Sequence, residues 1–129
     1  AGLADGTLSC ITSGHLPEDA ESKVVEFDLA HFGMLGLESA FALARTAAPQ
    51  LSTERLVEVF CNEPRQIAGI EIPKIEEGAT ANFTLFAPDA EWTFEKQNIR
   101  SLSRNTPLPG TKLKGKVFGI YNRGQFIGA

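Results

Sequence analysis

The sequence is poor in cysteine, histidine, tryptophan and tyrosine, and it has no long apolar run. No segment approaches the roughly 20 apolar residues that a membrane-spanning helix needs, so we expect no membrane partner. The basic residues are scattered, with Lys112, Lys114 and Lys116 the densest group, and the formal net charge is -4. A protein that binds nucleic acid is therefore not expected either.

The few cysteines and histidines argue against a metal centre built by this chain alone. Cys10 and Cys61 form no Cys-x-x-Cys pair, and we expect both to be reduced in a cytoplasmic protein, with one disulfide as the alternative. His15 and His31 fall short of the ligand number of a zinc site. The opening residues, AGLADGTLSC, show neither a secretory signal nor an initiator methionine, so we expect a processed or truncated chain.

The overall composition is typical of a folded, soluble domain. The hydrophobic fraction is 43% and the charged fraction 22% over 129 residues, enough for one ordinary core. The pattern changes near residue 70, where helical spacing gives way to short apolar runs between turns. Before that point, Leu8–Thr12 predicts a short buried strand, and residues 14–36 predict a long loop, which is usually a functional or mobile segment.

Three helices are expected between residues 37 and 69. Residues 37–48 place apolar side chains on one face before Pro49. Ser52 suits the N-cap of a second helix over 53–61, and Pro64 suits the first turn of a third, which Gly69 ends. The expected core residues of this part are Leu37, Phe41, Leu56, Val59 and Phe60.

Strands are expected after residue 70. Residues 81–88 alternate, with Phe83 and Leu85 on one face and Phe86 on the other, and a strand over 91–96 is expected after a turn at Pro88-Asp89. Residues 117–127 predict a hairpin that turns at 122–124.

The segment 101–115 predicts a polar connection in which Asn105 and Thr106 cap or staple a turn. Trp92 and Tyr121 are expected to pack on the sheet. A hairpin with two short strands is a poor sheet by itself, so the chain is expected to be the last part of something larger.

Four stretches, in order, resemble dihydroorotases. DGTLSCITSGHLPEDAESK is similar to the family pattern D-G-T-I-D-x-I-x-[ST]-D-H-A-P-H, and EFDLAHFGMLGLESAFAL to F-D-x-A-x-F-G-x-x-G-L-E-T. IEEGATANFTLFAPDAEWTF resembles E-G-x-x-A-D-L-x-L-F-D of amidohydrolases. SRNTPLPGTKLKGKVFGIYNRGQFI resembles the family ending S-x-N-T-P-F-x-G-x-x-L-x-G-K-V. The resemblance covers almost the whole chain.

The resemblance implies an α+β fragment of a larger fold. Residues 1–69 would supply the last strand and helices of a TIM-like (β/α)8 amidohydrolase barrel, with Leu8–Thr12 as the last barrel strand. Residues 70–129 would supply the C-terminal strands of a small β-sandwich. Active residues of such barrels lie at the C-terminal ends of the strands, where residues 11–15 would lie. The resembled family uses zinc.

The implied reaction is the reversible ring closure of N-carbamoyl-aspartate to dihydroorotate, a step of pyrimidine biosynthesis. In the family, the Asp of D-H-A-P-H is both proton shuttle and metal ligand. Gly14 stands in its place. The last His of that motif recognises the substrate carboxylate, and Glu18 stands there. The resemblance therefore implies a chain that is catalytically inactive as it stands, with no metal ligand of its own.

The other candidate residues between positions 14 and 36 each allow two interpretations. His15 is either a ligand or acid, or a packed histidine at the end of a strand. Phe32 and Gly33 match the Phe-Gly pair whose backbone contacts the pyrimidine ring, or Gly33 is only a turn residue. The acidic residues of the loop are either a metal site or a solvated surface; they are Glu18, Asp19, Glu21 and Glu26.

Three functional hypotheses follow. The first is the C-terminal part of a catalytically silent dihydroorotase homologue with an assembly role, partnered by itself, by the missing N-terminal part or by aspartate transcarbamoylase. The second is an active, metal-dependent cyclic amidohydrolase, a dihydroorotase or a hydantoinase, once the missing part is present. The third is a free-standing binding module, which the unpaired strand edges disfavour.

Overall fold

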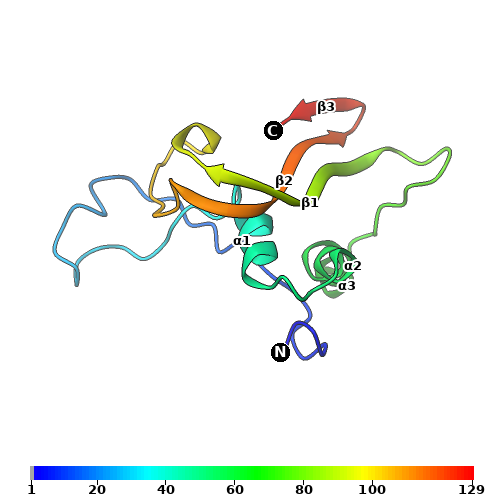
Figure 1. The fold of residues 1–129 in the computed structure, drawn as a ribbon, viewed down its shortest axis with the longest axis horizontal. Helices are drawn as coiled ribbons and strands as arrows, with labels where there is room; N and C mark the ends of the chain where they lie inside the picture. The colour runs from blue at the N-terminus through cyan, green and yellow to red at the C-terminus, as the bar shows by residue number, and fades with distance from the viewer. Residues whose placement is uncertain (1) are drawn as a thin grey trace.

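The computed structural model describes residues 2–129 and places helices before a three-stranded antiparallel sheet (Figure 1). The elements in chain order are α1 (Ala40–Ala47), α2 (Thr53–Val57), the π-helical η1 (Glu58–Asn62), α3 (Glu63–Ala68), β1 (Asn82–Phe94), the 3-10 turn η2 (Lys96–Asn98), β2 (Thr111–Asn122) and β3 (Gln125–Gly128). None of the helices within residues 2–129 is long and apolar enough to cross a membrane. The α+β class expected from the sequence is confirmed.

Strand β1 is one continuous strand, so the turn expected at Pro88-Asp89 is wrong. Ala87 pairs with Lys116 and Glu91 with Lys114, and the three residues between them bulge out of the ladder. One strand can gain residues over its partner at a bulge without reversing direction. The Pro-Asp pair therefore marks a bulge and not a turn.

A second irregularity corrects the predicted faces of β1. Leu85 pairs with Gly119, but the next residue, Phe86, pairs with Val117. Gly119 and Val117 lie two residues apart on β2 and share a face. Phe86 therefore joins the face of Leu85, and its ring lies 4.9 Å from that of Phe41 on α1.

Strand β2 begins at Thr111, earlier than predicted, so residues 111–115 are not part of the connection. Leu113 and Gly115 are buried, whereas Lys112, Lys114 and Lys116, which alternate with them, are exposed; this is the two-residue period of a strand with one solvated face. The predicted hairpin is confirmed. Its turn is Arg123-Gly124, with φ of 49° and 81°, the two positive values of a type I′ turn.

The first helix begins later and is shorter than the sequence predicted, whereas the second begins at Thr53 as predicted. Helix α1 starts at Ala40, and Leu37 before it is 65% exposed, so its assignment to the core is wrong. Ser52 caps α2 as expected, accepting from the amide of Arg55 at 3.1 Å. The π-helical η1 joins α2 to α3, so the second and third predicted helices form one continuous helical segment. Gly69 ends it with a left-handed φ of 66°.

The strand expected over Leu8–Thr12 is absent from the structure. A strand persists only where a neighbour pairs with it, and in this chain the Ile11 amide donates instead to the carbonyl of Val59 in η1, at 2.9 Å. Trp92 and Tyr121 pack on the sheet as predicted. The ring centroids of Trp92 and Phe94 lie 5.8 Å apart, and the ring of Tyr121 stacks on that of Phe83 with the centroids 5.4 Å apart.

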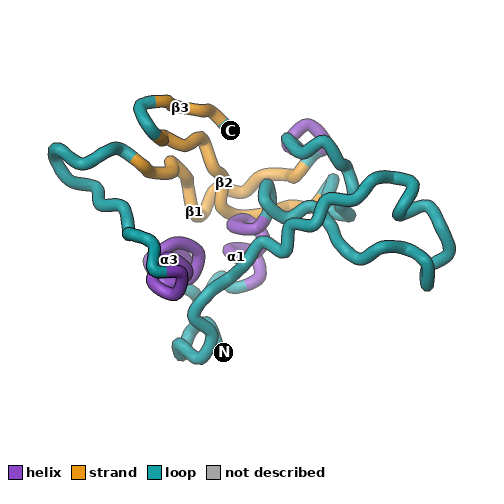
Figure 2. Tube along the Cα trace, turned by 180° about the vertical axis from the view of Figure 1, so that it is seen from behind, coloured by secondary structure: helices purple, strands orange, loops and turns teal. Residues whose placement is uncertain are grey.

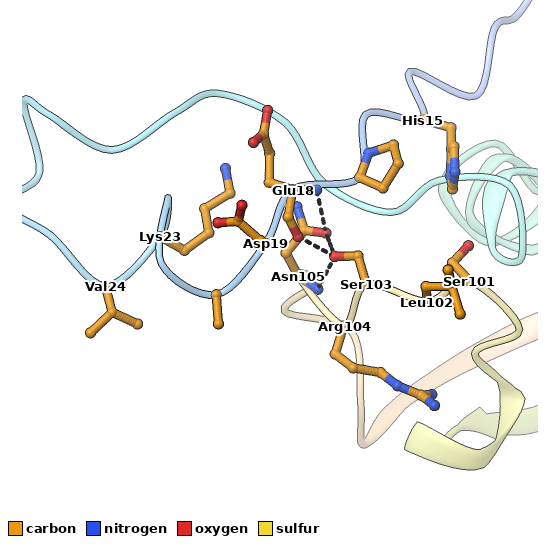
Figure 3. A pocket seen from close by; sticks show the side chains of 12 residues that line it. His15, Glu18, Asp19, Lys23, Val24, Ser101, Leu102, Ser103, Arg104 and Asn105 are labelled. Atoms are coloured by element: carbon orange, nitrogen blue, oxygen red, sulfur yellow. Dashed lines mark hydrogen bonds between the residues drawn. The ribbon is translucent and has the colours of Figure 1, made fainter.

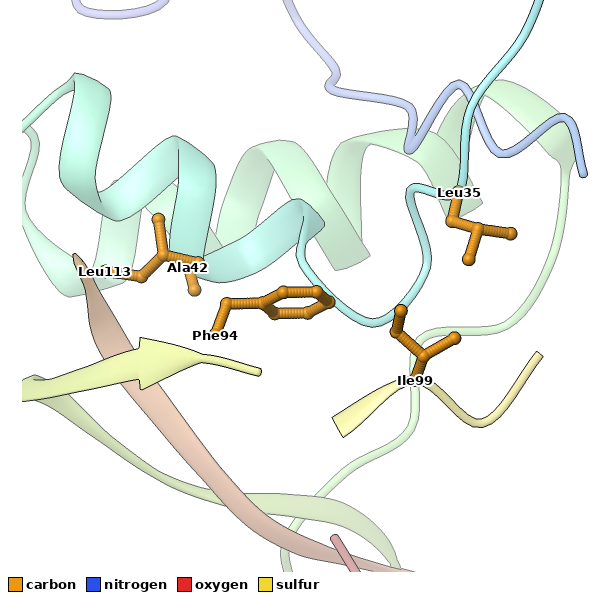
Figure 4. Packing of buried hydrophobic residues seen from close by; sticks show 5 residues of the cluster. All are labelled: Leu35, Ala42, Phe94, Ile99 and Leu113. Atoms are coloured by element: carbon orange, nitrogen blue, oxygen red, sulfur yellow. The ribbon is translucent and has the colours of Figure 1, made fainter. Parts of the chain in front are cut away.

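The main core lies where α1 covers the β1–β2 pair (Figure 4). Its residues come from the loop, the helix and both strands: Leu35, Ala42, Phe94, Ile99 and Leu113. Leu56 and Val59 are fully buried on the helical segment, as predicted, while Phe41 and Phe60 are half-buried and meet edge to face. Because the core draws on residues before and after residue 70, the helical and strand parts pack as neighbours.

Gly115→Ala is expected to destabilise the protein. At Gly115 φ is +87°, and an added Cβ would lie 2.9 Å from Cε1 of Phe41. The alanine would meet both an unfavourable left-handed backbone and a ring of α1. We expect a loss of about 3 kcal/mol in the free energy of unfolding, measured by urea unfolding of the complete protein.

Gly110→Ala is the matched control, because φ there is +89° and nothing lies within 4 Å of the added Cβ. Only the backbone strain remains, so about 1–2 kcal/mol is expected. Equal losses for the two variants would show that the ring of Phe41 does not limit the space at Gly115.

Candidate functional site

The 14–36 loop leaves the helices and the sheet, projects outward and returns to its own start (Figures 1 and 2). At its base, His15 and Met34 form a parallel β-bridge, and the Leu16 amide donates to the Met34 carbonyl at 3.0 Å. The two limbs of the loop, residues 15–18 and 31–36, therefore run side by side. Of the residues singled out in the sequence, His15, Glu18, Phe32 and Gly33 lie on these limbs and Gly14 directly precedes the first of them. Asp19, Glu21 and Glu26 lie in the projecting part between the limbs.

His15 serves the backbone of the loop. Its Nδ1 lies 3.2 Å from the amide nitrogens of Gly36 and Leu37 and accepts from both. Its own amide donates to the Ser13 hydroxyl at 3.2 Å. A ring nitrogen that accepts from backbone amides has its lone pair engaged. These contacts of the half-buried His15 therefore support its interpretation as a packed histidine that joins the two limbs.

Gly14 offers space but no side chain. Its φ is +58°, and nothing lies within 4 Å of the position that a Cβ would take. This left-handed conformation suits glycine and costs other residues about 1 kcal/mol or more. The backbone at this point is therefore shaped to the residue that is present.

Glu18 lies at the inner side of the loop, with its side chain only 20% exposed. Its carboxylate is 3.3 Å from Nδ1 of His31 on the opposite limb. Its amide donates to Oδ1 of Asn105 at 3.2 Å. The position is thus held from two sides and presents a negative group.

Phe32 and Gly33 lie on the returning limb. The Phe32 side chain is 92% exposed. At Gly33 φ is +123°, and a Cβ would lie 2.7 Å from the Leu16 carbonyl oxygen, so only glycine fits. The Gly33 carbonyl accepts from Nζ of Lys23 at 2.9 Å and from Nδ2 of Asn105 at 3.2 Å.

His15 and Glu18 border a groove of about 910 Å³ between the loop and residues 101–105 (Figure 3). Charged and polar side chains from both walls line it, namely His15, Glu18, Asp19, Lys23, Arg104 and Asn105. Hydrogen bonds from the Ser22 hydroxyl and amide hold the pKa of Asp19 below its ordinary value, so this exposed carboxylate stays ionised. The groove therefore presents charges of both signs beside the apolar side chains of Pro17, Val24 and Leu102.

The connection 101–105 is the wall that the sequence did not assign to the site. Asn105 was expected to staple a turn, and it does bond locally through Ser103, but its side chain also reaches both limbs of the loop. Glu38, just before α1, accepts from the amides of Arg100 and Ser101 and from the Ser101 hydroxyl. Burial raises the pKa of Glu38, but these bonds outweigh it and leave the pKa below its ordinary value of 4.5. An Asn or Ser in a polar connecting segment does not reveal from the sequence that it bonds to residues far away in the chain.

The residues of this chain do not fit a zinc ion by themselves. Within residues 2–129, no three His, Cys, Asp or Glu side chains gather closely enough to hold a metal, whereas zinc takes three or four such ligands. Gly14 has no donor group, and Nδ1 of His15 is engaged with backbone amides. The acidic metal site considered for the loop residues does not form, because their carboxylates are spread along the loop.

The chain is similar to curated dihydroorotases. It is 36% identical to the dihydroorotase of Chlorobaculum tepidum over 98% of this chain and 29% of that protein. It is 40% identical to the dihydroorotase of Anaeromyxobacter dehalogenans over 98% of this chain and 30% of that protein. The chain thus spans about three tenths of the length of these relatives. No family model matches it.

Solved structures of related enzymes share its fold. The L-hydantoinase (dihydropyrimidinase) of Arthrobacter aurescens superposes with a TM-score of 0.85 at 27% identity, over 98% of this chain and 30% of that one. The dihydropyrimidinase of Brevibacillus agri gives a TM-score of 0.80 at 21% identity, over 98% and 29%. The second likeness shows the fold alone.

His15→Asn is expected to be tolerated better than His15→Gln. The amide oxygen of asparagine takes nearly the place of Nδ1 and can still accept from Gly36 and Leu37, whereas that of glutamine lies nearer the place of Nε2. We expect the glutamine variant to lose about 1–3 kcal/mol in the free energy of unfolding, since it strands the buried Gly36 amide. Urea unfolding of the complete protein measures both.

The asparagine variant is the matched control and should lose less than about 1 kcal/mol. The reverse order of the two variants would show that Nε2, and not Nδ1, carries the role of His15. A backbone-holding histidine would then be the wrong interpretation.

Proposed function

This chain is related in sequence to the C-terminal portion of dihydroorotases, and on that premise we propose that it belongs to a catalytically silent dihydroorotase homologue. The relationship supports the cyclic amidohydrolase family as its origin. In the full-length protein we infer that residues 1–69 complete a (β/α)8 barrel and residues 70–129 a small β-sandwich. Zinc, where the full-length protein holds it, would depend on ligands outside this chain.

The observation that carries the proposal is Gly14. A carboxylate there would take and return a proton during ring closure, a contribution of about 10²- to 10⁴-fold in rate. Glycine supplies no such group, and its left-handed φ of +58° disfavours any side chain in its place. The proton transfer therefore has no agent at this position.

Glu18 supports the same conclusion from the binding side. The resembled family places a histidine there to recognise a substrate carboxylate. Here a carboxylate at the groove would repel another carboxylate, since like charges at contact distance disfavour each other. The Glu18 carboxylate contacts Nδ1 of His31 at 3.3 Å on the opposite limb.

We propose an assembly role for the silent protein, through self-association, contact with the missing N-terminal part, and binding of aspartate transcarbamoylase. The loop exposes large apolar side chains that a partner protein would cover on binding, namely Val24 (82% exposed), Phe27 (97%), Leu29 (64%) and Phe32 (92%). Apolar groups gathered at one surface of a folded protein commonly mark a contact region.

The full-length protein is expected to give no zinc-dependent cyclisation of N-carbamoyl-aspartate at an enzyme-like rate, because the general base is missing. Formation of dihydroorotate is measured with and without added zinc. The dihydroorotase of Chlorobaculum tepidum serves as positive control, and the Gly14→Asp/Glu18→His variant restores both altered positions. Turnover by the unaltered protein at a rate comparable with the control would refute the silent homologue.

A second function, an active amidohydrolase for another cyclic amide, is favoured by the likeness to the L-hydantoinase structure. It would require the missing part to supply the carboxylate and the metal ligands. The same assay, run with hydantoin and dihydrouracil, separates the two functions. Stoichiometric zinc together with hydrolysis of a cyclic amide would establish the second and exclude the first.

The full-length protein is expected to bind aspartate transcarbamoylase even though it catalyses no cyclisation itself. Full-length protein mixed with the transcarbamoylase of the same organism should elute as a single larger species in size-exclusion chromatography with light scattering. An unrelated enzyme of similar size is the control. Separate elution of the two proteins across a range of concentrations would remove this partner from the proposal.

A further inference from the structure

The side chain of Asn105 contacts both limbs of the 14–36 loop, and Figure 3 shows its contact with Glu18 on the first limb. Its Oδ1 accepts from the Glu18 amide and its Nδ2 donates to the Gly33 carbonyl, each at 3.2 Å. Its own carbonyl accepts from the Leu35 amide at 3.1 Å. Asn105 lies 87 residues beyond Glu18 and 72 beyond Gly33 in the sequence. These bonds are therefore tertiary contacts that join two distant parts of the chain.

Ser103 and Lys23 support the same side chain. The Ser103 hydroxyl lies between the Glu18 carbonyl and Oδ1 of Asn105, and with its single hydrogen it donates to one of them at a time. Nζ of Lys23 donates to the Gly33 carbonyl at 2.9 Å. Together with Nδ2 of Asn105 it occupies both lone pairs of that oxygen. The carboxamide thus sits in a connected set of hydrogen bonds.

Only a carboxamide of this length can both accept from the Glu18 amide and donate to the Gly33 carbonyl. It donates and accepts on one planar group, whereas aspartate accepts alone and an aliphatic residue does neither. A charged acceptor would also turn an oxygen toward the Gly33 carbonyl. The two bonds of Asn105 therefore depend on this residue type.

We propose that Asn105 is the positioning residue of the loop. Its carboxamide fixes the separation of Glu18 and Gly33, and so holds both limbs of the loop against residues 101–105, the other wall of the groove. This inference deepens the proposed function, since Glu18 and Gly33 stand at the positions where the resembled family contacts its substrate. The fixed separation itself depends on no ligand.

Hydrogen exchange of the full-length protein, followed by mass spectrometry, tests the role. In Asn105→Ala, the peptides covering residues 16–20 and 31–35 should exchange about 5- to 10-fold faster, the effect of losing one neutral hydrogen bond at each limb. Asn98→Ala is the matched control. Asn98 accepts from the Glu95 amide at 2.7 Å within η2, so its removal should leave the loop unchanged.

Asn105→Asp separates positioning from general stability. Aspartate can still accept from the Glu18 amide but cannot donate to Gly33, so only residues 31–35 should exchange faster. Lys23→Met, which removes the other donor to the Gly33 carbonyl, should release the same limb. If Asn105→Ala fails to fold, these two variants decide the question.

Three results would overturn the proposal. They are loop exchange in Asn105→Ala equal to that of the unaltered protein, a rise spread evenly over the whole chain, and release of both limbs alike in Asn105→Asp. None of these measurements uses turnover or a ligand. Failure of the positioning role is therefore distinguishable from failure of the proposed function.

Discussion

The packing of α1 on the β1–β2 pair is the contact on which the rest of the structure depends. The small side chain of Ala42 and the bare backbone of Gly115 let the helix and the strand approach, and the ring of Phe41 occupies the space that a Cβ at Gly115 would take. Arg45 on α1 bonds to the carbonyl of Pro88 at 3.3 Å and to Asp89 at 2.6 Å. The β1 bulge is thus where the strand is tied to the helix.

The same core positions both walls of the groove. Leu35, at the end of the returning limb, and Ile99, just before residues 101–105, are both buried in it. Glu38 then joins the start of α1 to Ser101 through its carboxylate. The loop and the connection are therefore held to one packed centre at their bases, and Asn105 adds the cross-link farther out. A change in the core would reach the groove through these attachments.

Local pattern predicted the helices, the caps and the hairpin, since each depends on residues close in sequence, as Ser52, Gly69 and Arg123-Gly124 illustrate. It failed where a distant partner decides the outcome. Leu8–Thr12 has the composition of a strand but has no strand to pair with in this chain, and Leu37 lies outside the core because α1 begins later. Gly14 and Glu18 were singled out by their departure from the resembled family pattern, whereas the contacts of Asn105 across 72 and 87 residues could not be foreseen from the sequence.

The shape of the 14–36 loop and the chemistry that we propose it lacks rest on different atoms. The limbs are held by the His15–Met34 bridge, by backbone amides on Nδ1 of His15 and by the Asn105 carboxamide. None of these contacts uses a side chain at position 14. The identity of residue 14 therefore does not decide whether the two limbs stay together. Under the proposed function, the loop therefore keeps its shape without the reaction, because the contacts that shape it and the proton transfer use different residues.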